Sequence, residues 1–181
     1  EELRRVARRG FKSALVRPIF SGTKYPTLPE YDPLWKEFEE LGMVLGMHTF
    51  PSRGEAMSAE LDQRMGANRK RLFGDEEILV YSPGQFVANI MQLMGSKQAG
   101  DAAFGFIAEA MTWTAVVLMT GWLEKFPRLK VAILESNCSW LPLVLEKAET
   151  YLDLYKHTGE KIGDPHEVFY KNCHIAFESD E

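Results

Sequence analysis

The sequence of 181 residues predicts an α/β fold built from consecutive strand and helix units. Four short apolar runs, each about the length of one strand, alternate with longer stretches in which apolar residues recur at helical spacing. The strand runs are apolar throughout, which is typical of strands that helices cover on both sides or that close into a barrel. We therefore expect a parallel sheet, or about half of an eight-stranded barrel, with its chemistry at the carboxyl ends of the strands.

The composition is that of an ordinary globular domain and argues against several functional classes. The net charge of −5, with no basic cluster beyond residues 69–71, argues against a nucleic-acid partner. Two cysteines, Cys138 and Cys173, are too few for a disulfide framework, so we expect reduced thiols and a cytoplasmic protein. The sequence contains no phosphate-binding glycine loop, Cys-x-x-Cys, His-Glu-x-x-His or Gly-x-Ser-x-Gly motif.

The first part of the chain predicts a helix, a strand and a loop. Residues 1–9 are typical of the second half of a helix that ends before Gly10, so we expect the sequence to be a piece of a longer protein. Residues 13–16 form an apolar strand, and Arg17 stands at its end because the following proline disfavours helix. Residues 19–31 have the composition of a loop.

A second unit begins at Asp32 and Pro33, which we expect to be the N-cap and a first-turn residue of a helix. The helix should stop at Gly42. The apolar residues of its buried stripe are Leu34, Phe38 and Leu41. Residues 43–47 then form a second apolar strand, and His48 follows directly.

The middle of the chain combines an irregular segment with a long apolar run. Residues 51–84 are polar, as in lids, binding loops or interfaces, and residues 85–94 are a weak helix candidate. Asp101 is expected to cap one long helix over residues 102–123. This run is long enough to cross a bilayer, but Glu109 and the Thr and Gly residues favour burial between neighbours or in a subunit interface. We expect no membrane partner, and we consider a homo-oligomer formed through this helix.

The last third of the chain contains the most clearly defined unit. Residues 129–134 form a strand, and Glu135 follows it where the chain turns into a helix. The buried stripe of that helix comprises Leu141, Val144, Leu145, Ala148, Tyr151, Leu152 and Tyr155. After a polar turn, residues 167–172 are expected to form a short helix and residues 173–178 the last strand.

Two ionisable side chains, His48 and Glu135, end two of the apolar strands. By strand alternation, His48 shares one side of its strand with Gly46, and Glu135 shares one side of its strand with Ile133. His48 could be a metal ligand or a general base, although a lone histidine is more often a hydrogen-bonded structural residue. Glu135 could transfer protons, bind metal or orient a histidine. The alternative is a carboxylate that stabilises the start of the next helix.

Three further residues are candidates for contacting a small-molecule substrate. Arg17 could clamp a substrate carboxylate with its two-pronged guanidinium group, or form an ion pair with Glu135 or Glu178. Asn137 and Trp140 follow Glu135 and could line a pocket. Trp140 also fits the buried stripe of the helix, and burial is the favoured interpretation.

Four segments of the chain have the pattern of a known family. They are V-R-P at residues 16–18, D-P-L-W-K-E-F-E-E-L-G-M-V-L-G-M-H at 32–48, F-P-R-L-K-V-A-I-L-E-S-N-C-S-W-L-P at 126–142, and the ending F-Y-K-N-C-H-I-A-F-E-S-D-E. Together they resemble the amidohydrolase-related metal-dependent hydrolases and decarboxylases, which include aminocarboxymuconate-semialdehyde decarboxylase. The resemblance implies a partial TIM (β/α)8 barrel, roughly strands four to seven, as one incomplete domain over residues 1–181.

The resemblance also implies roles for two residues. In that family a histidine at the end of the fifth strand binds the catalytic divalent metal, usually zinc, and His48 matches this position. The decarboxylases carry a proton-transferring histidine at the end of the sixth strand. Glu135 stands there in this chain, as in a branch of the family with E-S-x-x-x-W-L-P, so a decarboxylase mechanism would need a different base.

Other family residues have no counterpart in this stretch. The metal-binding pair of the first strand and the aspartate of the eighth strand are both missing, and a tetrahedral zinc site usually needs three or four protein ligands. We therefore expect these residues alone to be inactive.

The resemblance points to a metal-dependent hydrolase that acts on a small carboxylate or ring-cleavage compound. His48 would bind the metal, Glu135 would be the catalytic carboxylate, and the other three candidates, Arg17, Asn137 and Trp140, would lie near the substrate. Two alternatives stay open: a non-oxidative decarboxylase of the same family, and a non-catalytic barrel segment that serves packing or oligomerisation.

Overall fold

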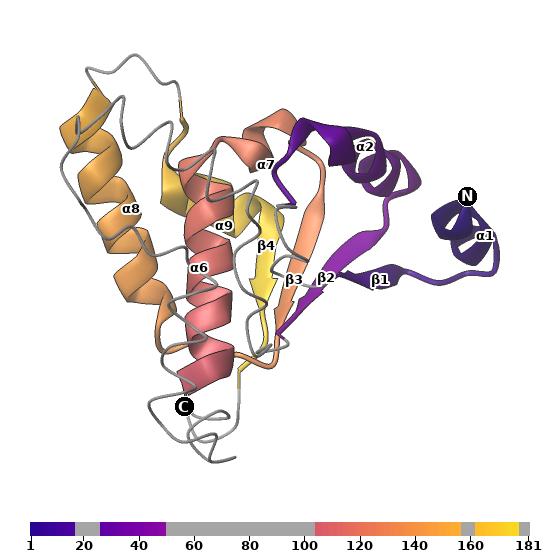
Figure 1. The fold of residues 1–181 in the computed structure, drawn as a ribbon, viewed down its shortest axis with the longest axis horizontal. Coiled ribbons are helices and arrows are strands. Elements are labelled where there is room, and N and C mark those ends of the chain that lie inside the picture. The colour runs from indigo at the N-terminus through magenta and orange to yellow at the C-terminus, as the bar shows by residue number, and fades with distance from the viewer. Residues whose placement is uncertain (17–25, 50–103, 157–161, 178–181) are drawn as a thin grey trace, which may run out of the picture.

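The computed structural model describes residues 1–16, 26–49, 104–156 and 162–177. Its centre is a sheet of four parallel strands in the order β1-β2-β3-β4 (Figure 1). The strands are β1 (Ser13–Val16), β2 (Val44–His48), β3 (Lys130–Leu134) and β4 (Cys173–Ile175). Each strand pairs with the one that precedes it in the sequence, which is the order of a barrel segment and not of a doubly wound sheet.

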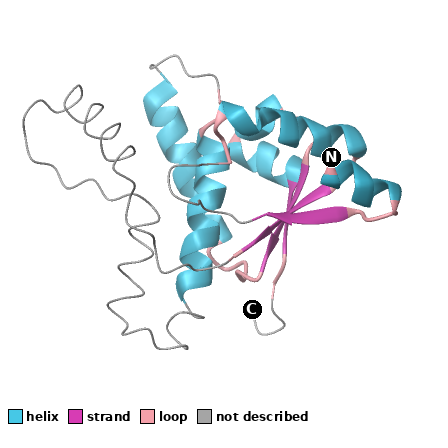
Figure 2. Ribbon diagram, turned by 45° about the vertical axis from the view of Figure 1, so that its right-hand side comes forward, coloured by secondary structure: helices cyan, strands magenta, loops and turns pink. Residues whose placement is uncertain are grey.

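One helix precedes β1, the others lie in the connections between strands, and the helices gather on one side of the sheet (Figure 1, Figure 2). They are α1 (Glu2–Arg8), the short 3₁₀ helix η1 (Pro29–Tyr31), α2 (Asp32–Leu41), α6 (Phe106–Met119), α7 (Trp122–Lys125), α8 (Leu141–Tyr155) and α9 (Pro165–Asn172). α6 contacts α7, α8 and α9. A sequentially ordered parallel sheet with helices on one side is an α/β fold consistent with a partial TIM-barrel-like domain.

Strand register explains which side of the sheet is buried. Leu45 pairs with Val131 and Met47 pairs with Ile133, and all four side chains are at most 1% exposed. These residues share one face because paired residues of parallel strands point to the same side. That face is the one covered by the helices.

The opposite face of the sheet is less covered. Leu15 is 63% exposed, and a Cβ placed on Gly46 would lie 2.6 Å from its Cδ2 atom. Glycine at this position therefore lets the Leu15 side chain lie against the backbone of β2. In a closed barrel this face would form the interior.

Aromatic side chains fill the core between α2, α6 and α7. The ring of Trp122 lies 5.5 Å from that of Trp35, 6.2 Å from that of Trp113 and 5.9 Å from that of Phe126, in edge-to-face contacts. All four residues are at most 5% exposed. Trp122 therefore connects the aromatic residues of three separate segments.

The start of α2 differs from the prediction. Asp32 is its first residue and not its N-cap, because η1 runs directly into α2 and leaves Tyr31 at the cap position. The Asp32 carboxylate pairs with Lys125 instead. The buried residues of α2 are Trp35 and Phe38, while the predicted Leu34 and Leu41 are each 38% exposed. The helix is rotated about its axis so that its aromatic residues, Trp35 and Phe38, face the core. It ends at Gly42, as predicted.

The single long helix predicted over residues 102–123 is wrong for the described part of that run. α6 ends at Met119, and Gly121 adopts a left-handed φ of 68° before α7 begins at Trp122. Glycine permits this turn without the steric cost of a Cβ. Within the described ranges, no helix is long and apolar enough to cross a membrane. Asp101 and the predictions for residues 51–84 and 85–94 lie outside the described residues.

Several predicted boundaries shift by a few residues. β2 includes His48, β4 ends at Ile175, and α9 begins earlier than predicted, at Pro165. The stripe predicted for α8 is buried at Val144, Leu145 and Ala148. Its last two aromatic residues, Tyr151 and Tyr155, are 49% and 53% exposed and stack on each other, because α8 continues to the edge of the molecule (Figure 1).

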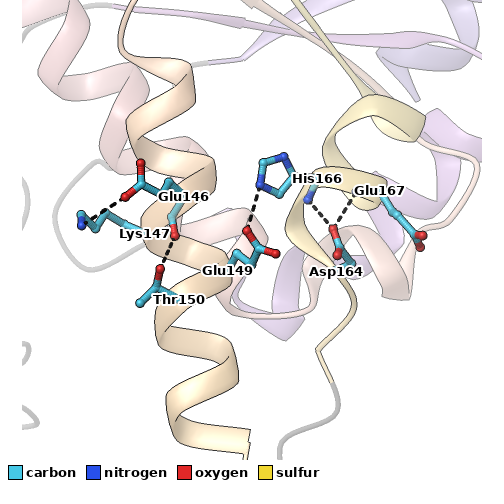
Figure 3. Close-up of polar contacts among 7 residues, drawn as sticks. All are labelled: Glu146, Lys147, Glu149, Thr150, Asp164, His166 and Glu167. Carbon is cyan, nitrogen blue, oxygen red and sulfur yellow. Dashed lines mark hydrogen bonds and ion pairs between the residues drawn. The ribbon is translucent and has the colours of Figure 1, made fainter.

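Asp164 caps the start of α9. Its Oδ1 atom accepts hydrogen bonds from the backbone N–H groups of His166, at 2.8 Å, and Glu167, at 3.0 Å (Figure 3). We expect Asp164→Ala to lower the free energy of unfolding by about 1 kcal/mol, because two helix-start donors lose their acceptor. Urea denaturation measures this loss. Glu146→Ala, which removes an exposed carboxylate from α8, is the matched control, and an equal loss in both variants would contradict the capping role.

Cys173 is a buried thiol of the core. Burial raises its pKa from the ordinary 9.0 to about 12. Because the folded-state pKa is the higher one, the contribution of the neutral thiol to stability is complete below about pH 9 and is lost as the pH rises toward 12.

Cys173 should therefore resist thiol reagents in the folded protein. In a Cys138→Ser variant we expect no reaction with a disulfide-exchange dye at pH 8 in native buffer, and full reaction after denaturation. Absorbance of the released dye measures the reaction. Rapid labelling without denaturant would show that the thiol is accessible and contradict its burial.

Candidate active site

The two ionisable strand-end residues lie together at the carboxyl ends of β2 and β3. His48 is the last residue of β2 and pairs in register with Leu134, the last residue of β3. The Nε2 atom of His48 lies 3.3 Å from the Oε2 atom of Glu135. The His48 side chain is 22% exposed and that of Glu135 is 61% exposed, so the pair stands at the surface end of the sheet.

Glu135 reaches His48 because the strand stops before it. Alternation continued from β3 would place Glu135 with Ile133 on the helix-covered face, whereas His48 shares the other face with its pairing partner Leu134. β3 ends at Leu134, and Glu135 adopts a left-handed φ of 52°. This turn breaks the alternation and directs the carboxylate toward the imidazole.

The alternative role for Glu135 at a helix start does not fit this geometry. α8 begins only at Leu141, and Trp140 occupies its N-cap position. The residues between Glu135 and Trp140 form a loop instead of the direct turn into the helix that the sequence predicted.

Thr49 is hydrogen-bonded to both candidate residues. The Nδ1 atom of His48 lies 2.9 Å from the backbone carbonyl oxygen of Thr49. Since a carbonyl oxygen can only accept, Nδ1 carries the proton of this bond, and Nε2 is the ring nitrogen that faces Glu135. The hydroxyl of Thr49, which is fully buried, donates to the backbone carbonyl of Glu135 at 2.9 Å. Sequence reasoning missed Thr49, although it directly follows His48 at the strand end.

The loop after Glu135 is held by Trp140. The indole N–H donates to the carbonyl oxygens of Ser136, at 2.8 Å, and Asn137, at 2.9 Å. Trp140 is 5% exposed and Ser136 is 2% exposed, and Asn137 has a left-handed φ of 55° that asparagine tolerates well. The predicted substrate contacts of Asn137 and Trp140 stay predictions. Arg17 and its predicted partner Glu178 lie outside the described residues.

Comparison with known proteins assigns the chain to a family. The amidohydrolase family model matches residues 1–169. The chain belongs to the amidohydrolase family. No curated protein matches this sequence.

Two solved structures share the fold of this amidohydrolase chain. An amidohydrolase from Mycobacterium avium subsp. paratuberculosis has 17% sequence identity and a TM-score of 0.65, over 99% of this chain and 39% of that one. 5-Carboxyvanillate decarboxylase from Sphingomonas paucimobilis has 19% identity and a TM-score of 0.58, over 96% of this chain and 42% of that one. The amidohydrolase chain thus spans about two fifths of the length of these proteins.

The amidohydrolase family generally uses a divalent metal, and the pair described above fits part of such a site. A histidine that binds metal usually donates its second ring N–H to a carbonyl or carboxylate, as His48 does to Thr49. The Nε2 lone pair and the carboxylate of Glu135 repel each other at 3.3 Å unless a proton or a cation lies between them. Among the described residues, no group of three His, Cys, Asp or Glu side chains could hold a metal ion. If a metal binds here, these residues would supply only part of its donor set.

Proposed function

We propose that this amidohydrolase-family protein is a metal-dependent hydrolase that acts on a small carboxylate or ring-cleavage compound. The observation that supports the proposal is the 3.3 Å approach of His48 Nε2 and Glu135 Oε2 at the carboxyl ends of adjacent parallel strands. In a TIM barrel those ends carry the active site. In this proposal β1 to β4 are strands four to seven of the complete barrel.

Each residue of the pair has a distinct role in the proposed reaction. His48 binds the metal through Nε2 while Thr49 fixes the ring through Nδ1. The carboxylate of Glu135 is 61% exposed, so it can take a proton from water or substrate and return it to a leaving group. A divalent ion, zinc in our proposal, would polarise the substrate or activate water. Its remaining ligands would come from residues outside the described ranges.

The substrate side of the proposal concerns Arg17, Asn137 and Trp140. Arg17 follows β1 and would meet a substrate carboxylate, while Asn137 and Trp140 would border the pocket next to Glu135. We propose a cytoplasmic protein with a small-molecule substrate and no nucleic-acid partner. Association of two copies through α6 is a further proposal, which light scattering on the purified protein tests.

A decarboxylase is the second candidate function. The similarity to 5-carboxyvanillate decarboxylase supports it. Against it stands Glu135, because the resemblance in sequence places a histidine at this position in the decarboxylases. A carboxylate beside His48 could still move protons, but it would be a different base.

One assay separates the two reactions. The natural full-length protein, loaded with zinc, is incubated with aromatic acids labelled with ¹³C in the carboxyl group and, separately, with lactones and amides of similar size. The proposal predicts new ring-opened or free carboxylates by NMR and no labelled bicarbonate. Labelled bicarbonate would favour the decarboxylase. A protein that neither turns over these compounds nor retains metal would be a non-catalytic barrel scaffold.

A further inference from the structure

We propose that Thr49 is a positioning residue, which acts through its hydroxyl group to hold Glu135 against His48. This inference rests on the proposed function of that pair. The hydroxyl donates to the Glu135 carbonyl at 2.9 Å, and the Glu135 carboxylate lies 3.3 Å from His48 Nε2. Thr49 touches the backbone of Glu135 and not its reacting carboxylate.

The backbone of Glu135 needs such support. Residues other than glycine, asparagine and aspartate rarely adopt a left-handed φ, and Glu135 does so at 52°. Such conformations persist where surrounding contacts enforce them. The bond from Thr49 holds the Glu135 carbonyl at the first position beyond the paired part of β3, where regular strand geometry has ended.

The burial of Thr49 makes this bond hard to replace. Thr49 is 0% exposed, so its hydroxyl gains little from solvent if the bond to Glu135 is lost. A buried hydroxyl is expected to have a specific partner, and the Glu135 carbonyl provides it. Valine has the shape of threonine with a methyl group in place of the hydroxyl, so it removes this bond with little change in side-chain size.

The two contacts of Thr49 can be separated by mutation. Its carbonyl accepts from His48, and its hydroxyl donates to Glu135. Thr49→Val removes the hydroxyl and leaves the carbonyl in place. The substitution should therefore disturb the position of Glu135 and leave the hydrogen bond at Nδ1 of His48 intact.

The test is a double-mutant cycle in the natural full-length protein. Thr49→Val and the hydroxyl-retaining control Thr49→Ser are each made in the native and in the Glu135→Gln background. The first readout is the imidazole ¹⁵N chemical shift of His48 in the metal-free protein. The second is the zinc dissociation constant by calorimetry. Circular dichroism confirms that each variant is folded.

Positioning through Glu135 predicts a specific pattern. Thr49→Val should shift the Nε2 resonance and weaken zinc binding about 10-fold in the native background, because it displaces the carboxylate that lies beside the proposed ligand His48. Thr49→Ser, which keeps the hydroxyl, should give a chemical shift and a zinc dissociation constant close to those of the native protein. In the Glu135→Gln background, Thr49→Val should have little further effect, because the carboxylate it positions is gone.

The remaining outcomes separate this inference from the proposed function. Equal effects of Thr49→Val in both backgrounds, or no effect in either, would overturn the positioning role. If the native protein still bound zinc in that case, the proposed function would stand. A coupled change in the ¹⁵N shift without zinc binding by the native protein would support the positioning role and contradict the metal-dependent function.

Discussion

Replacing His48 by alanine is expected to remove most of the metal from the natural full-length protein and to abolish turnover. His48 presents Nε2 at the strand end, and the Thr49 carbonyl fixes the orientation of its ring. Changing a residue that only orients a ligand costs about 10- to 100-fold in metal affinity, so removing the ligand should cost at least ~100-fold. Metal analysis by inductively coupled plasma mass spectrometry measures the loss.

His166→Ala is the matched control for this variant. His166 lies on α9, its side chain is 39% exposed, and it pairs with Glu149 of α8 at 3.5 Å (Figure 3). Its removal should leave the metal content unchanged. Equal metal content in the His48 and His166 variants would show that His48 is not a ligand.

Trp122→Ala is expected to cause the largest loss of stability among the described residues. Trp122 is 3% exposed and contacts three other aromatic rings, so alanine would leave a cavity where α2, α6 and α7 meet. Truncation of a buried tryptophan costs about 3–5 kcal/mol, a large share of the stability of an ordinary domain. The midpoint of urea unfolding, followed by far-ultraviolet circular dichroism, measures this change.

Two substitutions test the cause of that loss. Trp122→Phe should retain more than half of the lost stability, because the indole N–H finds no acceptor among the described residues and only packing is reduced. Tyr170→Ala, at a side chain that is 70% exposed, should change the stability by less than about 0.5 kcal/mol. A loss at Tyr170 as large as that at Trp122 would contradict the packing argument.

Much of the fold follows from the sequence because its causes are local. Continuous apolar runs predicted all four strands, and Gly42 ended its helix through the left-handed conformation that glycine favours. Other features depend on contacts distant in sequence. The apolar pattern continues across Gly121, so hydropathy did not show that α6 and α7 are separate. Likewise the pattern of α8 continues past the core, so it did not show that Tyr155 is exposed.

The positions of the two strand-end residues could be predicted from the sequence, but the contacts that orient them could not. His48 and Glu135 were each predicted at the end of a strand, and a parallel sheet delivers the carboxyl ends of its strands to one edge. Residue type did not reveal the left-handed turn at Glu135, since glutamate does not favour that conformation. Thr49 was missed because its role comes from a contact with Glu135, which is distant in sequence, and not from a sequence motif.

The central claim is that His48 binds the catalytic metal beside Glu135. A crystal structure of the natural full-length protein grown with zinc, with anomalous data collected at the zinc edge, tests it most directly. We predict an anomalous peak about 2.0–2.1 Å from His48 Nε2, with Nδ1 still bonded to the Thr49 carbonyl. A zinc peak elsewhere at the strand ends, with His48 Nε2 bonded only to Glu135, would contradict the account.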